Sequence, residues 1–76
     1  MKITFKNLGH LSNYTLYGAI VQQEYNQNAE IRENDPMFTG LYLYQYNDGT
    51  TIFQDKKYKN LNRAKNAAKG VINKWQ

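Results

Sequence analysis

The stretch TGLYLYQYNDGTTIFQD, residues 39–55, decides the fold of this chain. Its first half alternates strictly, so that an extended strand would present Leu41 and Leu43 on one face. The opposite face would carry three tyrosines: Tyr42, Tyr44 and Tyr46. The NDG run predicts a tight turn, because Gly49 can take the left-handed backbone that most side chains avoid. The stretch therefore predicts a β-hairpin.

Two registers of this hairpin remain open. If Tyr46 pairs with Thr50 through a type I turn and a glycine bulge, Leu43 lies opposite Phe53 on the core face. A two-residue loop would instead place Phe53 beside Tyr44. Because a shift of one residue moves every side chain to the other face, the register decides which aromatic side chains are buried.

After the hairpin, the hydrophobic period changes from that of a strand to that of a helix. Apolar residues recur three and four positions apart: Leu61, Ala64, Ala68, Val71, Ile72 and Trp75. Either Asn60 or Asn62 can cap the first turn, because an Asn side chain accepts a backbone N–H that has no partner within the helix. We therefore expect an amphipathic helix over the leucine face of the hairpin.

The N-terminal half contains two short candidate strands. Residues 2–6 predict a strand with Ile3 and Phe5 facing inward, followed by a loop over residues 7–13. Residues 29–33 are expected to return as an edge strand, which its charged side chains would protect from pairing with other chains.

Residues 14–25 allow two interpretations. Their β-branched and aromatic residues favour a strand, with Leu16, Gly18 and Ile20 on one face. A helix capped by Ser12 is the competing interpretation, because part of the same run also fits a helical pattern.

The expected fold class is α+β: a small antiparallel sheet of three to five strands packed against one C-terminal amphipathic helix. With 76 residues, a single domain over residues 1–76 is expected. Its core would combine residues from the strands and the helix: Phe5, Leu16, Ile20, Leu41, Leu43, Phe53, Leu61, Ala64, Ala68, Val71, Ile72 and Trp75. A homodimer would add stability to so small a core.

The composition argues against an enzyme. The chain has no cysteine and one histidine, His10, which we interpret as a hydrogen-bonded structural residue. No catalytic residue, metal site or cofactor is therefore expected. No apolar run approaches the length of a membrane span or a signal peptide, so a cytoplasmic location is the default expectation.

Positive charge is concentrated in the second half of the chain. The net charge is +4, of which residues 1–38 contribute −1 and residues 39–76 contribute +5. Together with the tyrosines, these cations form the candidate binding residues: Tyr42, Tyr44, Tyr46, Lys56, Lys57, Lys59, Arg63, Lys65, Lys69 and Lys74. An anionic partner would relieve the repulsion among them. A solvated Lys- and Asn-rich helix, with the tyrosines covered by other strands or a second subunit, explains the same pattern.

Residues 39–76 resemble the arm-type DNA-binding domain of phage and transposon integrases. The resemblance rests on the strand from Gly40 to Tyr46, the turn at Asp48-Gly49, the strand to Asp55 and the helix with Ala64 and Ala68. That family binds DNA with the exposed face of a three-stranded sheet backed by one helix. The resemblance implies that four residues of this chain face DNA: Tyr42, Tyr44, Lys56 and Lys57.

The short chain, rich in Asn, Tyr and Lys, also resembles in kind the small accessory proteins of phages and mobile elements, anti-CRISPR proteins among them. The first expected function is therefore a non-enzymatic inhibitor or modulator of a host protein or nucleoprotein complex. It would use the tyrosines and the acidic segment 24–35 as its contact surface. The alternative is a module that binds DNA or RNA through the basic hairpin and helix and the same tyrosines.

Overall fold

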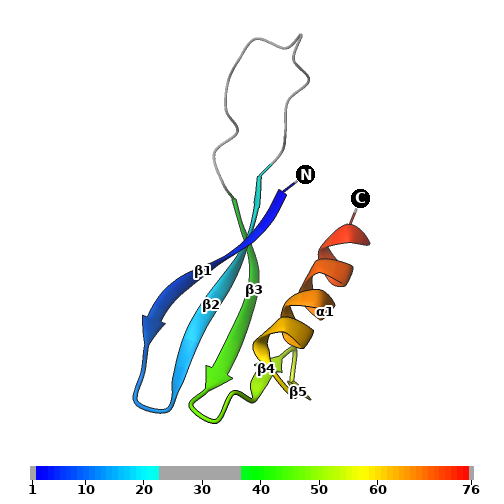
Figure 1. Ribbon diagram of the computed structural model, residues 1–76. Coiled ribbons are helices and arrows are strands. Elements are labelled where there is room, and N and C mark those ends of the chain that lie inside the picture. The colour runs from blue at the N-terminus through cyan, green and yellow to red at the C-terminus, as the bar shows by residue number, and fades with distance from the viewer. Residues whose placement is uncertain (1, 23–36, 76) are drawn as a thin grey trace, which may run out of the picture.

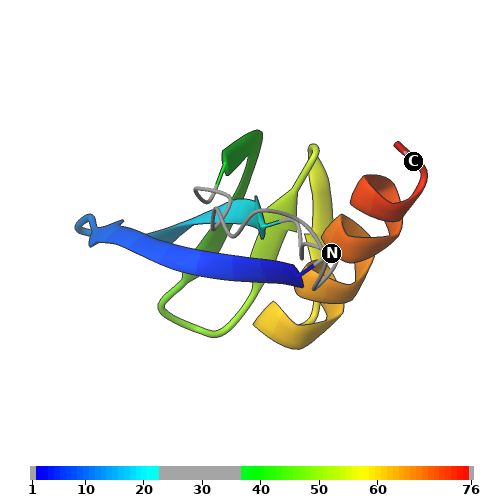
Figure 2. The same cartoon turned by 90° about the horizontal axis from the view of Figure 1, so that it is seen from above.

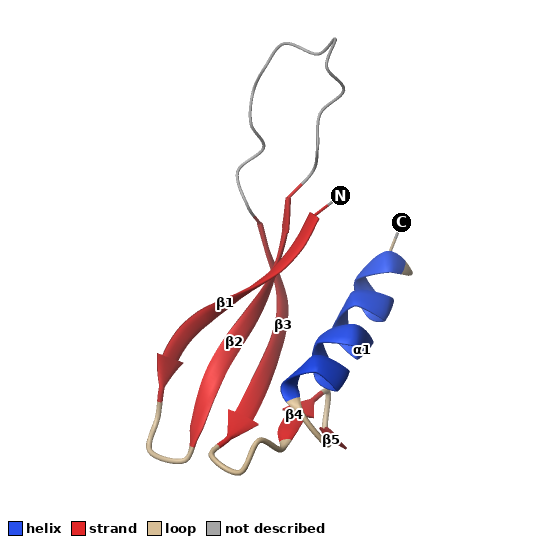
Figure 3. Cartoon of the chain, in the orientation of Figure 1, coloured by secondary structure: helices blue, strands red, loops and turns tan. Residues whose placement is uncertain are grey.

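The computed structural model describes residues 2–22 and 37–75 as one five-stranded sheet and one helix (Figure 1). The elements are β1 (Lys2–His10), β2 (Tyr14–Gln22), β3 (Met37–Tyr46), β4 (Thr51–Phe53), β5 (Lys56–Tyr58) and α1 (Leu61–Asn73). The strands lie across the sheet in chain order, and each is antiparallel to the next. The predicted α+β class, with a C-terminal helix on an antiparallel sheet, is confirmed (Figure 3).

The central hairpin adopts the register with a glycine bulge. The Tyr46 N–H donates to the Thr50 carbonyl at 2.7 Å, and the Gly49 N–H donates to the Tyr46 carbonyl at 2.9 Å. Gly49 has a φ of 92°, in the left-handed region that its lack of a side chain makes accessible. Leu43 consequently pairs with Phe53 on the core face, as the first of the two registers predicted.

A second hairpin follows that the sequence pattern did not indicate. The expected return strand ends at Phe53, because Gln54 and Asp55 have φ values of 51° and 64° and reverse the chain. Two consecutive left-handed residues are typical of a type I′ turn, whose twist suits a two-residue hairpin. β5 then pairs with β4, over residues for which no strand was predicted. The turn was missed because neither of its residues is glycine.

The N-terminal strands are longer than expected. β1 continues through residues 7–10, which were predicted to be a loop, with a bulge between Asn7 and Gly9. The Asn7 side chain accepts the Gly9 N–H at 2.9 Å, which stabilises the bulge locally. β2 is a strand, so the helical interpretation of its residues is wrong. The edge strand expected at residues 29–33 lies outside the described residues.

α1 lies on one side of the sheet and packs mainly against β3, β4 and β5 (Figures 1 and 2). Asn60 is its cap, because the Asn60 Oδ1 accepts the Arg63 N–H at 2.9 Å. The centre of the core consists of two strand and two helix residues: Leu43, Phe53, Ala64 and Ala68. The predicted leucine face of the hairpin is therefore the face that the helix covers.

Two residues assigned to this core, Trp75 and Leu16, lie elsewhere, and a third, Ile20, is buried as predicted but on the other face of the sheet. Trp75 is 56% exposed, because α1 ends at Asn73 and Trp75 follows its C-cap. Leu16 and Ile20 pair with Tyr44 and Phe38, which places both on the sheet face away from the helix. The alternation in the sequence correctly placed Leu16 and Ile20 on one face of their strand. It could not show which face of the sheet the helix covers, because that depends on tertiary packing.

Candidate binding surface

The sheet face opposite α1 carries the tyrosines singled out from the sequence. Residues paired across neighbouring strands share a face, so the register identifies the side chains that lie there. We call this surface the tyrosine face, and its members are Lys2, Thr4, Lys6, Leu8, Tyr14, Leu16, Gly18, Ile20, Gln22, Phe38, Tyr42, Tyr44, Tyr46, Ile52 and Lys57. No other element of the described chain packs against it.

Large side chains on this face are accessible. Tyr42 is 42% exposed and Phe38 is 53% exposed, while Tyr44 and Tyr46 are each 37% exposed. β1 and β2, which were one candidate cover for these side chains, instead extend the sheet beside β3. The helix leaves the tyrosine face open because it packs entirely on the leucine side.

A cluster of three rings occupies one end of the face. The ring of Tyr14 lies 5.4 Å from that of Tyr44, edge-on at 71°, and 5.7 Å from that of Tyr46. Such cross-strand aromatic contacts are favourable and restrict the orientation of each ring. Sequence reasoning did not single out Tyr14, because its place on this face depends on the pairing of β2 with β3.

Gly18 leaves space in the middle of the face, and two apolar side chains fill it. A Cβ atom added at Gly18 would lie 2.9 Å from the Leu8 Cδ1 and 3.3 Å from the Phe38 Cε1. Tyr42 is the cross-strand partner of Gly18, so this apolar surface continues into the ring cluster. Leu8 and Phe38 were missed from the sequence, because the bulge in β1 and the pairing of β3 bring them together.

The two adjacent lysines of β5 lie on opposite faces. Lys57 pairs with Ile52 and belongs to the tyrosine face, whereas Lys56 lies on the side of Phe53 and Tyr58. The Lys56 Nζ is 5.5 Å from the centre of the Tyr58 ring, a cation–π contact. Only Lys57 of this pair is therefore available to act together with the tyrosines.

The helical cations also lie apart from the tyrosine face. The Lys65 Nζ is 5.5 Å from the Phe5 ring and 5.9 Å from the Tyr17 ring, so Lys65 packs at the junction of helix and sheet. Four other predicted site residues are exposed on the helix or next to its ends: Lys59, Arg63, Lys69 and Lys74. The sequence suggested that these residues form one surface. In the structure they are divided between the two sides of the sheet.

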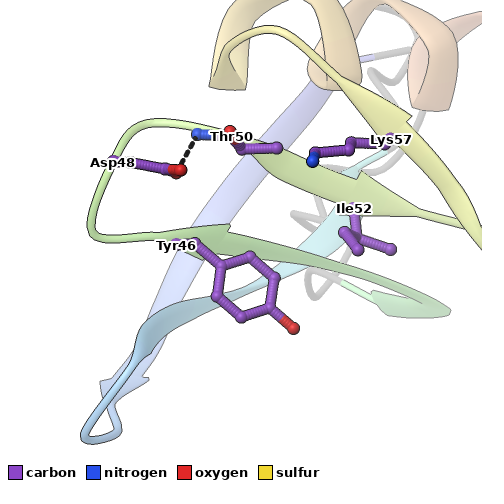
Figure 4. Close-up of a pocket in the computed structure, with 5 residues that line it drawn as sticks. All are labelled: Tyr46, Asp48, Thr50, Ile52 and Lys57. Carbon is purple, nitrogen blue, oxygen red and sulfur yellow. Dashed lines mark hydrogen bonds between the residues drawn. The ribbon is translucent and has the colours of Figure 1, made fainter.

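A shallow pocket opens at the end of the tyrosine face beside the NDG turn (Figure 4). Its volume is about 330 Å³, and five residues line it: Tyr46, Asp48, Thr50, Ile52 and Lys57. The Asp48 Oδ1 accepts the Thr50 N–H at 2.9 Å. This hydrogen bond is the main reason why the pKa of Asp48 lies below its usual value, and the positive charge of Lys57 shifts the pKa in the same direction.

The described part of the chain is strongly positive. Residues 2–22 and 37–75 contain nine Lys and Arg residues and two carboxylates, Asp48 and Asp55. Three lysines lie on the tyrosine face: Lys2 and Lys6 on β1, and Lys57 on β5. Asp48 is the one carboxylate that lines it, at the pocket, among the residues described. The acidic segment 24–35 lies outside the described residues.

No constellation for catalysis stands out in the part of the chain that the structure describes. The His10 Nδ1 lies 2.8 Å from the Thr15 Oγ1, which is the structural hydrogen bonding expected of this histidine. Within residues 2–22 and 37–75, no three His, Cys, Asp or Glu side chains gather in a way that could hold a metal ion. None of the described helices is long and apolar enough to cross a membrane.

The function of this surface is inferred from its own geometry and charge. No protein-family model, curated protein or solved structure matches the chain.

Proposed function

We propose that this protein is a non-enzymatic binding protein whose contact surface is the tyrosine face and whose partner is a nucleic acid or a host nucleoprotein complex. The observation that carries the proposal is a sheet face that the described helix leaves open, with exposed aromatic rings and three lysines. Aromatic and positively charged side chains on one surface are the combination that binds bases and phosphates.

The aromatic residues support a role in binding because the core does not require them. The helix packs on the opposite side of the sheet, against Leu43 and Phe53. Proteins seldom leave a continuous apolar surface open to water unless it contacts a partner. Tyr42 and Phe38 are therefore better explained as contact residues than as packing residues.

The charge of the described residues favours an anionic partner over a neutral one. Nine cations against two carboxylates give these residues a formal surplus of seven positive charges, and the net charge of the whole chain is +4. Such a surplus attracts a polyanion over distances of about 10 Å at moderate salt and accelerates its association. The cations on α1 contribute to this long-range attraction even though they do not line the tyrosine face.

The likeness in kind to small phage and mobile-element proteins supports the same proposal. A phage accessory protein of this type acts in the cytoplasm of a bacterial host cell, where it modulates or inhibits a host complex. A host protein is the second candidate partner. It is favoured by the exposed Tyr42, Phe38 and Trp75, since aromatic side chains dominate the binding energy of many protein interfaces.

Retention of nucleic acid tests the proposal. We expect the wild-type protein to retain bacterial DNA or RNA at about 50 mM salt and to release it as salt rises, because phosphate contacts release counterions. Tyr42→Ser should reduce retention. Lys69→Ser, on the helix side, is the control that shows how much retention falls when an exposed side chain outside the tyrosine face is changed. If the wild type retains no nucleic acid at about 50 mM salt, this proposal is wrong. A host protein that co-purifies after nuclease treatment and is lost in Tyr42→Ser would support the second candidate.

A further inference from the structure

We infer that the tyrosine face selects single-stranded nucleic acid over duplex, by stacking unpaired bases on its exposed rings. This inference rests on the proposed function, because it names the form of nucleic acid that the same surface would bind. Its basis is what the face offers chemically: accessible rings along its central strand and lysines near both edges of the sheet.

The exposed rings form a row with a regular spacing. Tyr42, Tyr44 and Tyr46 alternate along β3, so successive members are separated by about 6.6–6.8 Å of strand. Phe38 extends the row beyond Gly18, and Tyr14 supports its other end. Because every base has a flat aromatic surface, a row of rings can stack successive bases with little regard to their identity.

An intact duplex offers these rings no free base surface on which to stack. Its bases are already stacked on each other, and only their edges are open to a protein in the grooves. Reading those edges needs hydrogen-bonding side chains such as Arg, Lys, Asn or Gln, whereas the row along β3 consists of the aromatic rings of Phe38, Tyr42, Tyr44 and Tyr46. The face is therefore suited to unpaired bases and not to the groove of a duplex.

The lysines are placed to contact the backbone of a bound strand. Lys2 and Lys6 lie on β1 at one edge of the sheet, and Lys57 lies on β5 at the other, beside the pocket. In that pocket, Tyr46 and Ile52 provide an apolar wall for a base next to the ammonium group of Lys57 (Figure 4). The carboxylate of Asp48 also lines the pocket. Its hydrogen bond from the Thr50 N–H and the nearby Lys57 partly offset its repulsion of a phosphate.

Fluorescence anisotropy with a labelled oligothymidylate and a duplex of equal length tests the inference. We expect the single strand to bind at least about tenfold more tightly than the duplex at equal salt. Tyr42→Ser should weaken single-strand binding about 5- to 140-fold, the range that corresponds to the loss of one stacked base. Binding of the duplex should change little, because it depends mainly on charge.

Two further variants keep this test decisive. Phe38→Ser removes a second exposed ring and should also weaken single-strand binding, while Lys69→Ser should affect single strand and duplex alike. Equal affinity for both forms, or unchanged single-strand binding in both ring variants, would overturn the inference. If the duplex binds well and needs Tyr42, the inference fails but the proposed function stands. If neither form binds, both fail.

Discussion

Lys56 and Lys57 allow a charge-matched test of whether the tyrosine face holds a nucleic-acid backbone. They are adjacent in the sequence and equal in charge, but strand alternation directs them to opposite faces of the sheet. We predict that Lys57→Gln weakens the binding of a single-stranded oligonucleotide and that Lys56→Gln has a much smaller effect. Net charge is the same in the two variants, so any difference between them arises from position.

The size of the effect follows from counterion release. Each phosphate contact contributes about 0.7 to the slope of the logarithm of affinity against the logarithm of salt concentration for single strands. If Lys57 contacts one phosphate, Lys57→Gln lowers this slope by about 0.7. Between about 50 and 200 mM salt, the affinity of the variant should then fall by roughly 2.6-fold less than that of the wild type.

Lys56 has a different role in the structure. Its contact with the Tyr58 ring, at 5.5 Å, is worth about 0.5–1 kcal/mol at an exposed site. Lys56→Gln should therefore lower the free energy of unfolding slightly and leave the salt slope nearly unchanged.

Anisotropy titrations at four or more salt concentrations give the slope, and urea denaturation gives the stability of each variant. Equal changes of slope in the two variants would refute the reasoning, because binding would then depend on total charge and not on the face that a lysine occupies. A larger change in Lys56→Gln would place the nucleic acid on the helix side.

Other predictions concern stability. Asn60→Ala should lower the free energy of unfolding by about 1 kcal/mol and Tm by about 4–8 °C through loss of the helix cap. Asn62→Ala should leave Tm nearly unchanged. Similar losses in the two variants would contradict the assignment of Asn60 as the cap. In urea denaturation, Phe53→Ala should lose about 3–5 kcal/mol and Tyr42→Ser only about 0.5 kcal/mol, and a large loss for Tyr42→Ser would make that tyrosine a packing residue. The hydrogen bond from Thr50 lowers the pKa of Asp48, so the stabilising effect of the Asp48 carboxylate is complete above about pH 4 and is lost as pH falls below that value. Asp48→Asn should therefore flatten this part of the curve of stability against pH. Identical curves for the variant and the wild type would contradict this prediction.

Elements determined by neighbouring residues could be predicted from the sequence. The alternation of leucine and tyrosine and the turn glycine predicted the central hairpin, and the helical spacing and Asn60 predicted α1. These features depend on local backbone preferences and on the spacing of apolar residues within one segment. The turn at Gln54-Asp55 is local too, but its residues adopt a left-handed backbone without the glycine that would have signalled it.

Which residues form the tyrosine face could not be predicted from the sequence, because it depends on contacts between distant segments. Leu8, Tyr14 and Phe38 join Tyr42 because three strands pair in one register. Such pairing is not visible in any single segment.

By itself, the sequence determined the hairpin, the amphipathic helix, the positive charge of the second half and the separation of leucines from tyrosines. Only the tertiary structure decided that the helix covers the leucine side and that Lys57, of the two lysines of β5, lies with the tyrosines. The physical reason is that periodicity assigns side chains to opposite faces of an element, whereas burial depends on which face another element packs against.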